Sequence, residues 1–138
     1  MLLMAFFGLQ TLPAQSEGEI HPSQIAGLWE GYGYFCTGPV PVEIIEISVE
    51  GDSVTATKLD GDPCVPSGHK TWEGTMVGNT ITGHFYVSRG PNTEIFRAPS
   101  QSTFIVVDPD TIQVEGGAAI NFKRLPTVQE DDAGLFTN

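Results

Sequence analysis

Hydrophobic and polar residues alternate along most of the chain with the period of two that is typical of half-buried β-strands. Trp29, Gly31, Gly33 and Phe35 share one face of the first such segment, and the alternation resumes after each turn. The pattern therefore predicts strands, which in chain order cover residues 27–35, 42–49, 53–59, 70–77, 80–88, 94–97, 102–107, 111–115 and 118–125.

Short turns separate the predicted strands, and no segment between them has the period of a helix. Gly51-Asp52, Gly78-Asn79 and Gly116-Gly117 are short enough to join antiparallel neighbours as hairpins. An antiparallel sheet of this size buries its inner face and removes its free edges by closing on itself. The sequence predicts an all-β fold, a single antiparallel β-barrel of about eight or nine strands, with an open sandwich as the alternative.

One connection, residues 57–72, is built largely from residues that restrict the backbone. Pro63 and Pro66 fix φ, whereas Gly61 and Gly68 are free to adopt positive φ. We therefore expect a rigid loop that shapes one mouth of the barrel.

The two ends of the chain differ in composition from the predicted barrel, residues 25–125. Residues 1–14 form an apolar run with the length of a signal peptide, too short to span a bilayer. A helix packed on the barrel is the other reading of this run. Residues 15–24 form a polar lead-in, and residues 126–138 form an acidic tail that we expect to be flexible. This organisation predicts a secreted or extracytoplasmic protein.

The chain is strongly acidic, because it has 17 acidic and 6 basic residues and therefore a formal net charge of −11. Such an excess repels phosphate backbones and anionic lipid headgroups. We therefore expect no nucleic-acid partner, and no membrane partner once a signal peptide is cleaved. Solubility in an extracellular setting explains the same charge.

The chain has two cysteines, Cys36 and Cys64, each in a turn region that follows a predicted strand. In an oxidising compartment they can close one disulfide across an end of the barrel, which would stabilise it by roughly 3–4 kcal/mol. The spacing of the cysteines is not that of a zinc site. A catalytic pair of Cys64 with His69 is the remaining alternative.

The ends of the predicted barrel carry a first resemblance. Gly27-Leu28-Trp29 in the first strand and Lys123-Arg124 in the last resemble the calycin pattern of lipocalins and avidins. The resemblance implies a calycin-like barrel in which Arg124 packs over the ring of Trp29. This structural contact would be worth about 0.5–2 kcal/mol.

A second resemblance covers roughly half the chain. Gly27-Leu28-Trp29-Glu30-Gly31, Val42-Glu43-Ile44-Ile45 and the block Ala-Thr-Lys-Leu-Asp-Gly-Asp-Pro-Cys-Val-Pro-Ser-Gly at residues 56–68 carry it. They resemble the C-terminal substrate-binding barrel of an F-box ubiquitin-ligase receptor family and of the plant chloroplast Executer proteins. The resemblance implies a barrel that receives a ligand or peptide at its mouth. The chain contains no F-box, so ligase recruitment is not implied.

The chain departs from this family at both cysteines. Cys64 stands where the family usually has Asn, and Cys36 lies where the family has a Gly-x-His-Gly turn. Both changes fit a disulfide added to an exported barrel. The missing His puts any binding role of that turn in doubt.

Six residues are candidates for lining a ligand cavity. Lys58 lies opposite Glu43 on neighbouring strands, and the two either point inward as an ion pair or lie on the solvated outer face. Arg89 and Arg97 flank a polar connection and either hold a carboxylate-bearing ligand or form local salt bridges. Trp72 supplies aromatic surface, and His84 lies in mid-strand, where a lone His is more often a surface residue.

These candidates lead to three hypotheses of function. The first is a secreted binding protein that holds a small apolar ligand or a peptide end in its cavity. The second is a cavity enzyme of the cyclase or isomerase type, which leaves almost no sequence signature. The third is a protein–protein interaction module that docks through residues 57–72. No cofactor and no metal site are expected, and the sequence favours binding over catalysis.

Overall fold

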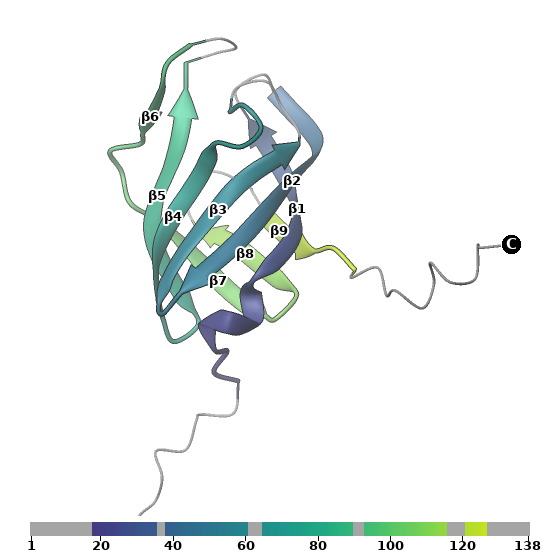
Figure 1. The fold of residues 1–138 in the computed structure, drawn as a ribbon, viewed down its shortest axis with the longest axis vertical. Coiled ribbons are helices and arrows are strands. Elements are labelled where there is room, and N and C mark those ends of the chain that lie inside the picture. Colours follow the sequence, from purple (N-terminus) through teal and green to yellow (C-terminus); the bar gives the residue numbers. More distant parts are fainter. Residues whose placement is uncertain (1–17, 36–37, 61–64, 90–92, 116–120, 127–138) are drawn as a thin grey trace, which may run out of the picture.

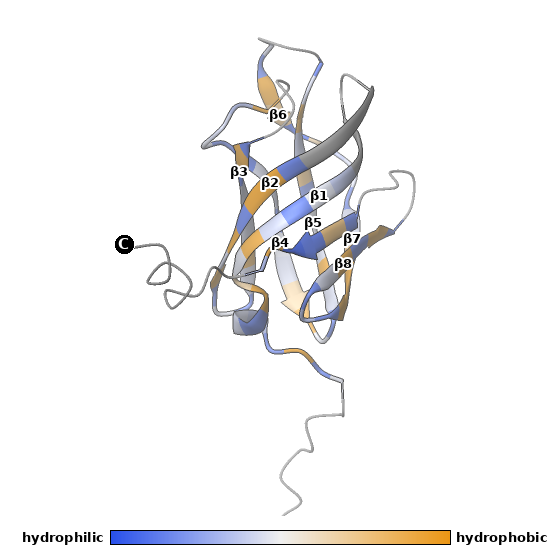
Figure 2. Ribbon diagram, turned by 90° about the vertical axis from the view of Figure 1, so that its right-hand side faces the viewer, coloured by the Kyte–Doolittle hydropathy of each residue, from blue (hydrophilic) through white to orange (hydrophobic). Residues whose placement is uncertain are grey.

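Nine antiparallel strands and one short 3-10 helix make up the part of the chain that the structure describes, residues 18–35, 38–60, 65–89, 93–115 and 121–126 of a computed structural model. Hydrophobic and hydrophilic positions succeed each other along the strands (Figure 2). The elements are η1 (Pro22–Ile25), β1 (Gly27–Phe35), β2 (Gly38–Glu50), β3 (Ser53–Asp60), β4 (Lys70–Val77), β5 (Thr80–Ser88), β6 (Ile95–Arg97), β7 (Ser102–Asp108), β8 (Thr111–Glu115) and β9 (Asn121–Arg124).

Eight of these strands close into a barrel (Figure 1). Closure follows from the pairing of β1 with both β2 and β9, and from the pairing of β4 with β5. The extra strand, β6, pairs only with the end of β5, where Tyr86 lies opposite Arg97. The predicted all-β fold with a closed antiparallel barrel is confirmed.

The predicted boundaries agree with the structure for β4, β5 and β8, but β2 begins earlier than expected. Gly38 and Pro39, which lie between the predicted strands 27–35 and 42–49, pair with Phe35 and Tyr34 of β1. The pairing of β2 with β3 stops at Ile44, so Gly38, Pro39, Val40 and Glu43 are paired with β1 only. Proline is tolerated there because its missing N–H can face away from the single partner strand.

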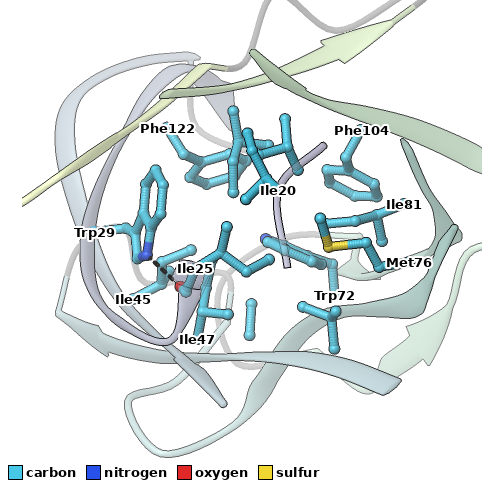
Figure 3. Close-up of a cluster of buried hydrophobic side chains, with 14 residues drawn as sticks. Ile20, Ile25, Trp29, Ile45, Ile47, Trp72, Met76, Ile81, Phe104 and Phe122 are labelled. Atoms are coloured by element: carbon cyan, nitrogen blue, oxygen red, sulfur yellow. Dashed lines mark hydrogen bonds between the residues drawn. The ribbon is translucent and has the colours of Figure 1, made fainter. Parts of the chain in front are cut away.

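A hydrophobic cluster fills one end of the barrel, and Figure 3 labels most of its members. The inward positions of successive strands supply it, and Ile20 and Ile25 add to it from the N-terminal side of β1. The predicted polar lead-in therefore contributes to the core. The buried members are Ile20, Ile25, Trp29, Ile45, Ile47, Val54, Ala56, Trp72, Met76, Ile81, Phe104, Val106, Ile112 and Phe122.

Arg124 and Trp29 hold η1 against this end of the barrel. The guanidinium carbon of Arg124 lies 4.7 Å from the centroid of the Trp29 ring, as the calycin resemblance predicted. Arg124 also donates hydrogen bonds to the carbonyls of Gln24, Ala26 and Pro109, and Trp29 Nε1 donates to the carbonyl of Ile25 at 2.9 Å. We call this the closed end.

The opposite end, which we call the loop end, carries the ends of β1, β3 and β5 and the starts of β2 and β4 (Figure 1). In the described part of the chain, no helix has the length and apolar character needed to cross a membrane.

Candidate functional site

An ion pair lies inside the barrel towards the loop end. Lys58 of β3 and Glu43 of β2 are 1% and 2% exposed, and the Lys58 Nζ–Glu43 Oε2 distance is 4.0 Å. Each lies one inward-facing position nearer the loop end than Ala56 and Ile45 of the core cluster. Of the two orientations that the sequence analysis considered for this pair, the side chains adopt the inward one.

Lys58 is also the residue to which the described part of the 57–72 loop is attached. Its backbone N–H donates to the carbonyl of His69 at 2.9 Å, and its carbonyl accepts from Gly68 N–H at 2.7 Å. Gly68 has a φ of 87°, and His69 N–H bonds back to the carbonyl of Pro66 at 3.1 Å. The loop exit and the buried ammonium group are therefore positioned by the same backbone.

Glu43 has room inside the barrel because its neighbour on β1 is Gly31. A Cβ atom on Gly31 would lie 2.8 Å from Glu43 Cγ and 3.0 Å from Phe122 Cε1, closer than such contacts allow. The missing side chain thus leaves the space that the carboxylate side chain occupies.

Trp72 places an unpaired donor in the same interior. Its side chain is fully buried and its ring stacks on Phe104, with 4.4 Å between centroids and a 24° interplanar angle. Trp72 Nε1 has no hydrogen-bond partner, and Figure 3 shows it directed towards the middle of the barrel. A buried donor left in this state costs about 1–3 kcal/mol. Trp29 Nε1, at the closed end, is paired.

An apolar wall adjoins Trp72. Phe85 is its Cα partner on β5, and the Phe85 ring lies 5.1 Å from that of Phe104. Phe85 and Val114 pack on the core cluster but stay partly exposed, unlike the cluster itself. The interior thus combines apolar surface, an ion pair and an N–H group that lacks an acceptor.

Three of the six predicted lining residues do not belong to this interior. His84 faces outward, because Ile81, Gly83 and Phe85 take the inward positions of β5, and its Nδ1 bonds to the carbonyl of Ala98 at 2.9 Å. Arg97 lies opposite Tyr86 on the same outer face and is exposed. The prediction of one shared lining is wrong for these two residues, since β-strand alternation separates them from Lys58.

Arg89, the third, is exposed beyond the end of β5. It lines a separate recess of about 440 Å³ with Thr93, Glu94 and Phe96. The prediction that it shares a lining with Lys58 is therefore wrong as well.

Sequence reasoning missed a polar cluster on the outer face of β4 and β5. Glu73 accepts from Lys70 Nζ at 2.7 Å and from the Tyr86 hydroxyl at 2.7 Å. Strand alternation alone would give Lys70 the same face as Trp72. The pairing of β4 with β3 shifts register at this point, between Trp72 and Lys70, and so brings Lys70 to the side of Glu73.

The hydrogen bonds of this cluster shift the pKa values of all three groups. The bond from Lys70, followed by the bond from Tyr86, lowers the pKa of Glu73 below its usual 4.5. The bond to Glu73 raises the pKa of Lys70 and that of Tyr86. The three groups are therefore held as carboxylate, ammonium and neutral phenol across the neutral range.

Several predictions concern residues outside those that the structure describes. They include both cysteines, Cys36 and Cys64, the N-terminal residues 1–14 and most of the acidic tail. Within the described residues, no three His, Asp or Glu side chains gather to hold a metal ion.

Comparison with family models and with curated proteins identifies no relative of this chain. No protein-family model matches the chain, and a search of curated proteins finds no match. The two resemblances above therefore rest on the residues quoted for them.

Proposed function

We propose that this protein is a binding protein that holds one small molecule, or the end of a peptide, at the loop end of its barrel. The ligand approaches past the 57–72 loop, places an oxygen acceptor at Trp72 Nε1 beside the Lys58–Glu43 pair, and lays an apolar body along Phe85. The observation that carries the proposal is the fully buried, unpaired N–H of Trp72.

The energetics of the interior support a role beyond stability. A buried ion pair is often no more stabilising than apolar residues of the same volume, because both charges lose their hydration. Here such a pair lies in the same interior as a donor whose hydrogen bond is missing. Polar groups that converge in an otherwise apolar interior are typical of a ligand site.

The chemistry of the three groups limits the ligand. Indole N–H is a donor only, so its complement is a carbonyl or carboxylate oxygen. The ammonium of Lys58 favours a carboxylate, and Phe85 and Val114 favour an aliphatic or aromatic body. A fatty acid and an apolar peptide with a free C-terminus both fit this description.

The proposed setting is extracytoplasmic. The apolar residues 1–14, the acidic composition and the two cysteines support it. In this setting Cys36 and Cys64 form the proposed disulfide, and the full chain then has no thiol that can be alkylated before reduction.

Binding is tested on the full-length protein with two probes, decanoate and an apolar hexapeptide with a free C-terminus. Native mass spectrometry should detect a one-to-one adduct with at least one probe. The double variant Lys58→Met/Glu43→Leu should lose the adduct while it keeps the thermal stability of the barrel. An amidated peptide and decanoate methyl ester serve as matched probes without the carboxylate. Absence of a saturable adduct with both acids, or equal binding by the double variant, would reject the proposal.

A further inference from the structure

A second recess lies on the outer face of the barrel, away from the interior site. It has a volume of about 330 Å³, and its lining comes from β3, β4, β5, β6 and the connection before β7. Apart from two glycines, every lining side chain is polar or charged. The lining residues are Ser53, Glu73, Gly74, Thr75, Thr82, Gly83, His84, Arg97 and Gln101.

The recess exists because β5 changes partner along its length. Its first half pairs with β7 as far as Gly83, and its second half pairs with β6 from Tyr86 onwards. Figure 1 shows β6 at the side of the barrel next to β5, with the connection to β7 below it. The Ala98 N–H bonds to the carbonyl of Phe85 at 2.7 Å, which fixes this connection as one wall.

The floor is bare backbone. Gly74 and Gly83 are Cα partners, and a Cβ atom on Gly83 would lie only 1.8 Å from the carbonyl oxygen of Glu73. Both glycines lie at inward positions of their strands, so the outward-facing polar side chains supply the chemistry of the recess.

The acidic group at this recess is already neutralised. Glu73 accepts hydrogen bonds from Lys70 and from Tyr86, one on each of its carboxylate oxygens. Arg97 lies near enough to contribute to the lowered pKa of Glu73, yet it makes no hydrogen bond or ion pair with any described residue. Its five N–H donors are therefore free to bind a ligand.

The charge of the surroundings favours an anion. Lys70 and Arg97 are two of only 6 basic residues in a chain of net charge −11, and they face the single carboxylate of Glu73. The nearby His84 donates its Nδ1–H to the Ala98 carbonyl, so Nε2 of the neutral ring is an acceptor and supplies no donor to an oxyanion.

We propose that this recess binds a small ligand through an oxyanion group. The planar fork of Arg97 binds two oxygens of the ligand, as guanidinium groups do with carboxylate and phosphate. Gln101 and the hydroxyl groups of Thr75 and Thr82 complete the site as donors. An apolar ligand finds no matching surface here, and a cation would face Lys70 and Arg97.

The test is a titration of the full-length protein with succinate and, separately, with inorganic phosphate, followed by amide NMR. Saturable shifts should be confined to the outer faces of β4 and β5 and to residues 97–101. Saturation by succinate alone, by phosphate alone or by both supports the proposal and identifies the oxyanion that the site accepts.

Two matched variants decide whether the site is the one described. Arg97→Gln should weaken binding by about tenfold or more, because it removes a charge-assisted bidentate contact. Arg89→Gln makes the same change of charge at the separate recess beside Glu94 and should leave the affinity within about twofold. Absence of saturable shifts with both anions, or equal weakening by the two variants, would overturn the proposal. Because neither variant touches Trp72, these outcomes are independent of binding inside the barrel.

Discussion

Arg124 and Trp29 are direct Cα partners across the seam between the last and first strands of the barrel, and the guanidinium group of Arg124 lies over the Trp29 ring. The same guanidinium group donates to the carbonyls of Gln24 within η1, of Ala26 directly after it, and of Pro109 in the turn before β8. Arg124 and Trp29 thus hold η1 at the closed end together. The proposed ligand would therefore enter from the loop end.

Replacing Arg124 should show how much this contact stabilises the barrel. Arg124→Lys keeps the charge but loses the planar fork and most of the hydrogen bonds to carbonyls, so we expect a loss of about 1–3 kcal/mol in the free energy of unfolding. Urea denaturation measures it. The exposed neighbour Lys123, which lies over Tyr32, is the control, and Lys123→Gln should change stability by less than about 0.5 kcal/mol. If the two variants changed the free energy of unfolding equally, the stabilising role assigned to Arg124 at the closed end would be contradicted.

The two tryptophans form a natural pair for testing the unpaired donor. Trp72→Phe removes a donor that has no partner, whereas Trp29→Phe leaves the carbonyl of Ile25 without its donor and puts a smaller phenyl ring under Arg124. We expect Trp72→Phe to cost no more than the loss of ring area, because it also removes an unpaired donor, and Trp29→Phe to cost about 2 kcal/mol more than Trp72→Phe. Thermal unfolding followed by circular dichroism ranks them. The reverse order would show that Trp72 Nε1 is satisfied in solution.

The buried ion pair should respond differently to single and double replacement. Lys58→Met leaves the Glu43 carboxylate in a buried site and should cost about 3–5 kcal/mol. Lys58→Met/Glu43→Leu removes both charges and should restore most of that loss, since apolar residues of similar volume pack as well. A double variant as unstable as the single one would mean that the pair is a structural requirement.

Acid should weaken the outer cluster around Glu73. Its folded pKa lies below the unfolded value of about 4.5, so its stabilisation is complete above that value and is lost as pH falls through the lower, folded pKa. At pH 7, Glu73→Gln should cost about 1 kcal/mol or less in the free energy of unfolding, because Lys70 and Glu73 are both partly exposed. Once the Glu73 carboxylate is protonated, the substitution should cost nothing. Unfolding curves from pH 7 to pH 2 provide the comparison. Glu46→Gln, on an exposed position of β2, should follow the wild type throughout.

Much of the fold could be predicted because antiparallel hairpins are local. Turns such as Gly78-Asn79 join adjacent strands, so alternation on each side is enough to place β4 and β5. The early start of β2 could not be predicted from Pro39, because a proline is acceptable wherever a strand is paired on one side only.

The candidate sites were predictable only where alternation is unbroken. Lys58 lies in an uninterrupted alternating strand, and its burial follows from Val54 and Ala56 on the same face. Lys70 lies beyond the shift of register in β4, so its contact with Glu73 has no sequence signal. Alternation in β5 excludes His84 from the lining, because Gly83 and Phe85 on either side of it take the inner face.

The central proposal is that Trp72 Nε1–H donates a hydrogen bond to a ligand oxygen. The most direct measurement is the pair of indole N–H signals in a ¹H–¹⁵N spectrum of the full chain during titration with decanoate and with the free-acid hexapeptide. We predict that the Trp72 indole signal moves downfield to saturation with at least one of them, while the Trp29 signal, already bonded to Ile25, stays in place. A Trp72 signal that does not move with either ligand, or two signals that move together, would contradict the account.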